Sequence, residues 1–164
     1  MDSLAPFLES AEIPLEHLLL DPNNPRFVGV DWVFVPDQEA VEPTAQAEAR
    51  RRLIAHHDIE KLRQSIEANG YLPIDRIVVR AISGDRYIVL EGNRRVCAAK
   101  EIGGFSDDGE KLPNDVMDTL KVIPCLIYTG DNTGNEAAWI FQGIRHISGV
   151  NEWPAFNKAK LLVD

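Results

Sequence analysis

The sequence is poor in cysteine and has no long apolar run, and each shortage excludes a class of protein. Its two cysteines, Cys97 and Cys125, form no Cys-x-x-Cys pair, so neither a disulfide framework nor a cysteine-based zinc site is expected. No window approaches the roughly 18 consecutive apolar residues of a membrane span. Residues 1–12 carry acids and no base, unlike a secretory signal. We therefore expect a soluble cytoplasmic protein with two packed thiols.

The chain also lacks an excess of basic residues. It has 17 lysines and arginines against 26 acids, for a net charge of −9. The excess is N-terminal, because residues 1–49 hold ten acids and one base, whereas residues 50–95 hold ten bases and six acids. A domain that covers DNA usually has a basic face throughout. The local basic region suits one phosphate-bearing ligand better than a long duplex.

The length of 164 residues and the 45% hydrophobic content fit one compact domain. Asp58 precedes an apolar helical pattern as a predicted N-cap, Gly70 ends that pattern, and Pro124 moves its strand toward a sheet edge. The patterns lack the regular alternation of a doubly wound sheet, so we predict an α+β fold, a small mixed β-sheet flanked by helices. The predicted elements are an early strand within 13–21, helices 44–57 and 59–69, strands 77–82 and 86–90, helix 93–102, strand 122–128 and helices 133–147 and 151–164.

The domain prediction is a single unit over residues 1–164. Residues 28–57 contain an acidic stretch that indicates an insertion. The last helical pattern has no C-cap. We therefore expect residues 148–164 to begin a C-terminal helical extension of a longer chain.

The sequence Leu90-Glu-Gly-Asn-Arg-Arg95 stands where a predicted strand meets a predicted helix. Gly92 has no Cβ, so a ligand can approach the backbone there. The free N–H groups of the following helical turn attract anions. Arg94 and Arg95 add two guanidinium groups that point about 100° apart. One can reach a phosphate while the other braces Glu91, or both can be surface residues paired with acids.

Five motifs follow one another between Ile13 and Leu162. They are a loosened ILxxLxxDPxNPR at 13–26, IEKLRQSIEANGYLPI at 59–74, YIVLEGNRRVCAAKEIG at 87–103, VIPCLIY at 122–128 and GIRHISGVNEWPAFNKAKLL at 143–162. In this order they resemble the ParB N-terminal domain, of the ParB/sulfiredoxin fold. In ParB proteins a G-E-R-R motif lines the triphosphate of a bound nucleotide, and here it stands as Gly92, Asn93, Arg94 and Arg95.

The resemblance also implies roles for residues outside this motif. Arg26 matches the arginine after the early Asn-Pro loop, and Gly70 matches the turn near the nucleotide base. Where ParB has E-N-x-Q-R, this chain reads Gln142-Gly-Ile-Arg-His146, so an acid that would help to hold Mg²⁺ is absent. Arg145 and His146 would instead close the phosphate pocket, with His146 able to transfer a proton near neutral pH.

The sulfiredoxin branch has its catalytic cysteine where this chain has Asn93, so peroxiredoxin repair is excluded. The first hypothesis is a domain that binds a nucleoside triphosphate, CTP or ATP with or without Mg²⁺, hydrolyses it or not, and acts on DNA or a DNA-associated protein. A second copy of the chain is a further candidate partner. The second hypothesis is a ParB-like nuclease, which needs Asp21, Glu91 and Asp131 to gather around a metal. The third is a non-catalytic adaptor that binds a protein through its acidic N-terminal surface.

Overall fold

A five-stranded mixed sheet organises the molecule. The computed structural model describes residues 7–27, 33–56, 58–74, 76–104 and 112–130. The strand order is β1-β5-β3-β4-β2. Neighbours are antiparallel in β1/β5 and β3/β4 and parallel in β3/β5 and β2/β4, so the α+β prediction is confirmed. The strands are β1 Leu8–Pro14, β2 Leu18–Leu19, β3 Ile77–Ser83, β4 Arg86–Glu91 and β5 Val122–Tyr128.

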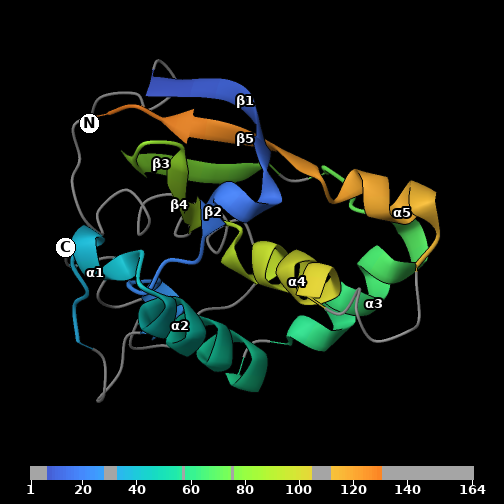
Figure 1. Ribbon diagram of the computed structural model, residues 1–164, viewed down its shortest axis with the longest axis horizontal. Helices are drawn as coiled ribbons and strands as arrows, with labels where there is room; N and C mark the ends of the chain where they lie inside the picture. Colours follow the sequence, from blue (N-terminus) through green and yellow to red (C-terminus); the bar gives the residue numbers. More distant parts are fainter. Residues whose placement is uncertain (1–6, 28–32, 57, 75, 105–111, 131–164) are drawn as a thin grey trace.

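Helices α2, α3 and α4 gather on one side of this sheet. Figure 1 shows α2, α3 and α4 together below the sheet, with α5 beside the end of α3. Among the described residues, no helix is long and apolar enough to cross a membrane. The α-helices are α1 Asp37–Ala40, α2 Pro43–His56, α3 Ile59–Asn69, α4 Asn93–Gly104 and α5 Asn114–Thr119, and two short 3-10 helices are η2 Leu15–His17 and η3 Pro25–Phe27.

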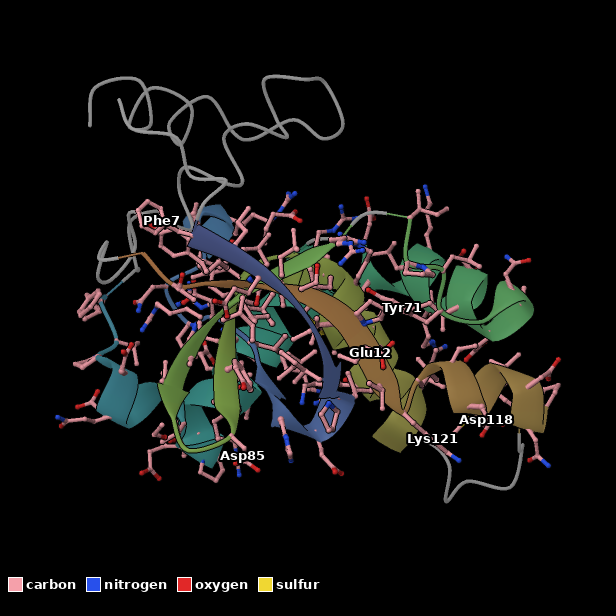
Figure 2. The ribbon with its side chains drawn as sticks, turned by 90° about the horizontal axis from the view of Figure 1, so that it is seen from above. Phe7, Glu12, Tyr71, Asp85, Asp118 and Lys121 are labelled. Atoms are coloured by element: carbon pink, nitrogen blue, oxygen red, sulfur yellow. The ribbon has the colours of Figure 1, made fainter. Side chains whose placement is uncertain are left out.

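Most of the predicted elements between residues 44 and 104 are confirmed. Helix α3 begins directly after Asp58 and ends before Gly70, whose N–H donates to the Ile66 carbonyl at 2.8 Å. The side chain of Asp58 makes no capping hydrogen bond, because this residue has a left-handed backbone with φ of 57°. Strands β3 and β4 form the predicted hairpin, which turns at Gly84 and Asp85. Figure 2 shows Asp85 at the tip of this hairpin, away from the α5 end of the molecule, where Asp118 lies.

Three predictions differ from the structure. The early strand is two strands, β1 and β2, separated by η2, and helix α5 was not predicted. Strand β5 was expected near a sheet edge but lies between β1 and β3. Pro124 is tolerated there because β3 pairs with β5 only from Cys125 onward, so on that side the missing N–H interrupts no ladder. The predicted helices 133–147 and 151–164 lie outside the described residues.

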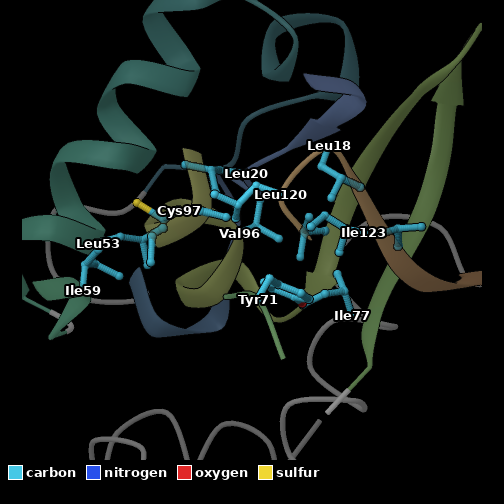
Figure 3. Packing of buried hydrophobic residues seen from close by; sticks show 14 of the residues in the cluster. Leu18, Leu20, Leu53, Ile59, Tyr71, Ile77, Val96, Cys97, Leu120 and Ile123 are labelled. Carbon is cyan, nitrogen blue, oxygen red and sulfur yellow. The ribbon is translucent and has the colours of Figure 1, made fainter. Parts of the chain in front are cut away.

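The main core lies between the sheet and helices α2, α3 and α4. Figure 3 shows Leu53 of α2, Ile59 of α3 and Val96 of α4 facing side chains of the strands. Both cysteines are free and buried, as predicted, and burial raises the pKa of each thiol to about 12. Neither is therefore a nucleophile at neutral pH. The largest fully buried apolar side chains of this core are Leu18, Leu53, Ile77, Val79, Val89, Val96 and Ile123.

Candidate functional site

The junction of β4 and α4 is a tight turn that only glycine can form. Gly92 has φ of +103°, a conformation that side chains disfavour. A Cβ at this position would also overlap the Ile77 side chain of β3. The Gly92 carbonyl accepts the first helical hydrogen bond, from Val96 N at 3.0 Å. Gly92 therefore turns the chain directly from the buried strand into helix α4.

The first turn of α4 can attract an anion. The N–H groups of residues 93–95 precede the first donor of the helical ladder, Val96 N. Such N–H groups carry a fractional positive charge and point out of the helix end. Because Gly92 presents no side chain, an oxyanion can approach the backbone closely.

Arg95 lies beside this turn. A Cβ built on Gly92 would come within 3.5 Å of Arg95 Nη2. The same nitrogen is 3.6 Å from Glu91 Oε2, and both side chains are mostly buried, with 18% and 13% of their surface exposed. Arg94 is partly buried on the adjacent face of the helix. The expected contact between an arginine and Glu91 is thus confirmed for Arg95, whose guanidinium group lies next to the Gly92 turn.

Asn93 connects the turn to a loop far away in the sequence. Its Oδ1 accepts a hydrogen bond from Asp21 N at 2.8 Å, and its Nδ2 donates to the Val89 carbonyl of β4 at 2.9 Å. The residue is 3% exposed. The loop 20–27, which carries Arg26, is thereby joined to the start of α4 across 72 residues. The structure brings together two motifs that the sequence separates.

The loop 20–27 is rich in buried polar groups. The Asn23 side chain donates to the Val35 carbonyl and accepts from Val35 N, both at 2.7 Å. The Asn24 Oδ1 accepts from Arg26 N at 3.0 Å. In the described part of the chain, Asn24 Nδ2 is buried without a hydrogen-bond partner. An unsatisfied buried donor costs about 1–3 kcal/mol, so this amide is a candidate to donate to a ligand oxygen.

Asp21 is a buried acid of the same loop. Its Oδ1 accepts from Asn23 N at 2.8 Å. Burial raises its pKa from 3.8 to about 7, although the Asn23 N–H and the charge of Arg80 act in the opposite direction. Arg80 donates two hydrogen bonds to Asp37, at 2.8 and 3.0 Å, which lower the pKa of Asp37. The pKa of Asp21 is therefore near neutral, and the nearby charge of Arg80 is paired with Asp37.

Gly70 lies in a different contact. It has φ of +77°, and a Cβ there would be 3.2 Å from Thr119 of α5. Thr119 Oγ1 also accepts from Tyr71 N at 2.9 Å and donates to the Val116 carbonyl at 2.6 Å. The described contacts of Gly70 thus join α3 to α5, and its role near a nucleotide base stays a prediction. Figure 2 places Tyr71 on the α5 side of the molecule.

Some of the predicted site residues lie beyond the part of the chain that the structure describes. Arg145 and His146 lie outside the described residues, as does Asp131. Within the ranges that the structure describes, no group of three or more histidine, cysteine or acidic side chains could hold a metal ion. Asp21 and Glu91 therefore belong to no such group among these residues, and a role for Mg²⁺ stays a prediction.

Sequence reasoning missed Gln46, Asn23 and Asn24. The Gln46 side chain accepts from Leu20 N at 2.9 Å and donates to the Leu20 carbonyl at 2.8 Å. A signal for the asparagines was present, because Asn23 and Asn24 stand between two prolines in DPNNPR. Such a segment cannot use a regular backbone ladder and needs side chains to satisfy its polar groups. No comparable local pattern marks Gln46.

A comparison with protein-family models supports the resemblance. Residues 39–105, less than half of the chain, match the model of the ParB N-terminal domain. No curated protein matches. A crystal structure of the C-terminally truncated chromosome-partitioning protein ParB from Caulobacter crescentus, complexed with CTP-gamma-S, is similar at 20% identity and a TM-score of 0.49. The similarity covers 88% of this chain and 56% of that chain, so this chain spans little more than half of its length.

Proposed function

We propose that this ParB-like chain binds the phosphates of a nucleoside triphosphate at the start of helix α4. The observation that carries the proposal is the joined site, in which Asn93 holds the loop bearing Arg26 against the Gly92 turn. The family match includes this turn, residues 92–95. The first-turn N–H groups would bind phosphate oxygens, and Arg95 would add a charge-assisted contact from the edge of the turn.

The nucleotide in this proposal is CTP or ATP. Arg94 and Arg26 would contribute further positive charge, and Arg145 and His146 would close the pocket from the C-terminal part of the chain. Hydrolysis would require a proton-transferring group, for which His146 and Glu91 are the candidates. No step of the proposal runs through a metal ion.

The proposed setting is a process on DNA. A bound nucleotide would change the fit of this domain for DNA, for a DNA-associated protein or for a second copy of the chain. We propose that nucleotide binding here acts on a partner, and base reading is no part of the proposal.

The test combines a thermal-shift screen of ATP, CTP and GTP with calorimetric titration of the best ligand. Each charge-assisted hydrogen bond contributes about 1.5–3 kcal/mol. Arg95→Ala should therefore weaken binding by roughly tenfold to a hundredfold. Arg51→Ala, which removes a guanidinium group from the exposed face of α2, is the matched control and should bind as the unmodified chain does. Equal affinity of Arg95→Ala and the unmodified chain would refute the proposal.

A further inference from the structure

Asn93 follows Gly92 in the turn of the candidate site. Both polar atoms of its side chain form hydrogen bonds with other parts of the protein. The amide oxygen accepts from Asp21 N, and the amide nitrogen donates to the Val89 carbonyl. Both bonds are buried, and Asn93 is the second residue of the turn that would hold phosphate. Because these bonds point the side chain into the protein, it does not extend toward a ligand at the turn. Asn93 would therefore affect a ligand through Asp21 and the loop that follows it.

The backbone hydrogen bonds described within the loop that Asn93 holds are local ones. Asn24 N donates to the Asp21 carbonyl at 3.1 Å, and Phe27 N donates to the Asn24 carbonyl at 2.8 Å. Two side chains from outside the loop bind its first backbone groups. Gln46 of α2 binds both the N–H and the carbonyl of Leu20, and Asn93 of α4 binds the next N–H, that of Asp21. Of these two sets of hydrogen bonds, only the one from Asn93 connects the loop 20–27 to α4, the helix that would bind phosphate.

We propose that Asn93 is a positioning residue, which fastens the loop 20–27 to the first turn of α4 and so preforms the phosphate site. This inference rests on the proposed function. Asn93 supplies the acceptor that fixes the loop, and the same loop carries Arg26 and the buried Asn24 amide, which lacks a hydrogen-bond partner among the described residues. Preorganisation of this kind raises affinity because the ordering cost is paid before the ligand binds.

A consequence is that ligand binding and loop closure are thermodynamically linked. If the ligand binds only when the loop is fastened, it must slow every opening of the loop. The amide of Asp21 reports on that opening directly, because its hydrogen is bonded to Asn93. At a nucleotide concentration 100 times the Kd, exchange of this amide hydrogen should slow by up to about 100-fold.

The experiment measures hydrogen exchange over residues 20–27 and calorimetric affinity for the nucleotide that binds best. The variants are Asn93→Ala and, as a control of matched type, Val116→Ala, which removes buried apolar atoms from α5. We expect Asn93→Ala to speed exchange of residues 20–27 and to weaken binding about tenfold or more. Val116→Ala should lower the melting temperature while keeping the affinity within about twofold.

Each outcome decides between the two proposals. Nucleotide-dependent protection of residues 20–27 in the unmodified chain, together with weakened binding by Asn93→Ala, supports the inference. If the unmodified chain binds nucleotide but Asn93→Ala binds equally well, or if the loop gains no protection, the inference is wrong and the proposed function stands. If the unmodified chain binds no nucleotide, the proposed function fails and this inference fails with it. The protection measurement needs no variant, so it decides even if Asn93→Ala does not fold.

Discussion

Two arginine clusters of this protein look alike in sequence but differ in structure. Arg50, Arg51 and Arg52 lie in the middle of helix α2, where the backbone N–H groups belong to the helical ladder. Arg51 is 61% exposed, and its guanidinium donates to Glu48 at 2.6 Å. Arg50 likewise pairs with Glu101. Arg50 and Arg51 are therefore exposed arginines paired with acids.

The pair at the start of α4 has another setting. Arg95 is 18% exposed and lies beside Gly92, at the helix end where N–H groups point outward. Its acidic partner, Glu91, is 3.6 Å away, longer than the contacts of Arg51. Under the proposed function, the arginines at the start of α4 would bind an anion because of their place on the helix and the backbone beside them. Residue type alone does not distinguish the two clusters.

The largest expected effect comes from the backbone of the α4 turn. Gly92→Ala places a Cβ into the Ile77 side chain at a φ of +103°. Overpacking and the strained backbone together should lower the free energy of unfolding by about 2–5 kcal/mol. Gly84→Ala is the matched control, because Gly84 also has a positive φ, 53°, but no atom within 4 Å of its added Cβ. It should cost about 1 kcal/mol.

Urea unfolding of both variants checks this prediction. The α2 cluster contains no position with a comparable demand on the backbone among the described residues, since its helix is regular. If Gly92→Ala and Gly84→Ala lose the same stability, the turn at α4 is not the tight junction that the site requires.

The next largest effect is expected on the pH dependence of the free energy of unfolding, which acids of the two regions should influence in opposite directions. The pKa of Asp21 is about 7 in the folded chain and 3.8 when exposed, so the folded state retains its proton between these values. Stability should fall as pH rises from about 4 to 7, by up to about 4 kcal/mol at roughly 1.4 kcal/mol per unit. Asp21→Asn, whose Oδ1 can still accept from Asn23 N, should remove this slope.

The α2 region should show the opposite sign. Hydrogen bonds from Arg51 and Arg52 lower the pKa of Glu48 to about 2. Its contribution to stability is present above pH 4.5 and is lost as pH falls toward 2. Unfolding free energies of the unmodified chain and Asp21→Asn, measured from pH 3 to 8, separate the two acids. An unchanged slope between pH 4 and 7 in Asp21→Asn would contradict the assignment to Asp21.

The smallest effect is expected on the exposed face of α2. Arg51→Ala removes a surface ion pair three residues from its partner on the same helix. Such exposed pairs contribute little to stability and are screened by salt. The change in unfolding free energy should therefore be smaller than for the variants above and decrease further in 1 M NaCl. A larger, salt-independent loss would show that this cluster supports the fold in a way that its contacts do not indicate.

Much of the fold was predictable because its elements carry local signals. The hairpin turn at Gly84, the helix of residues 59–69 with its terminal Gly70, and the turn at Gly92 were predicted from residue types whose backbone preferences are strong. Helix α5 was not, because its six residues are too few to show a helical period. The place of β5 was wrong because a proline signals where a ladder is interrupted, whereas strand order depends on distant pairing.

The site was predictable only in part for a similar reason. The residues at Gly92 and Arg95 were predicted from the helix start and from the family resemblance. The fastening of the loop 20–27 was not, because it depends on hydrogen bonds from Gln46 and Asn93 across 26 and 72 residues. No local pattern records such contacts. The amides at Gly92 and Asn93 were predicted to bind phosphate, which stays a prediction, and the Asn93 side chain binds Asp21 and Val89 of the protein.

The central claim is that the start of α4 holds the phosphates of a nucleotide. It is tested most directly by titrating CTP and ATP into the isotopically labelled chain and following each backbone amide by NMR. The account predicts the largest shifts at the amides of residues 92–95, with smaller shifts in the loop 20–27 and none at Arg50, Arg51 and Arg52. Saturable shifts at the α2 arginines with none at residues 92–95 would contradict it.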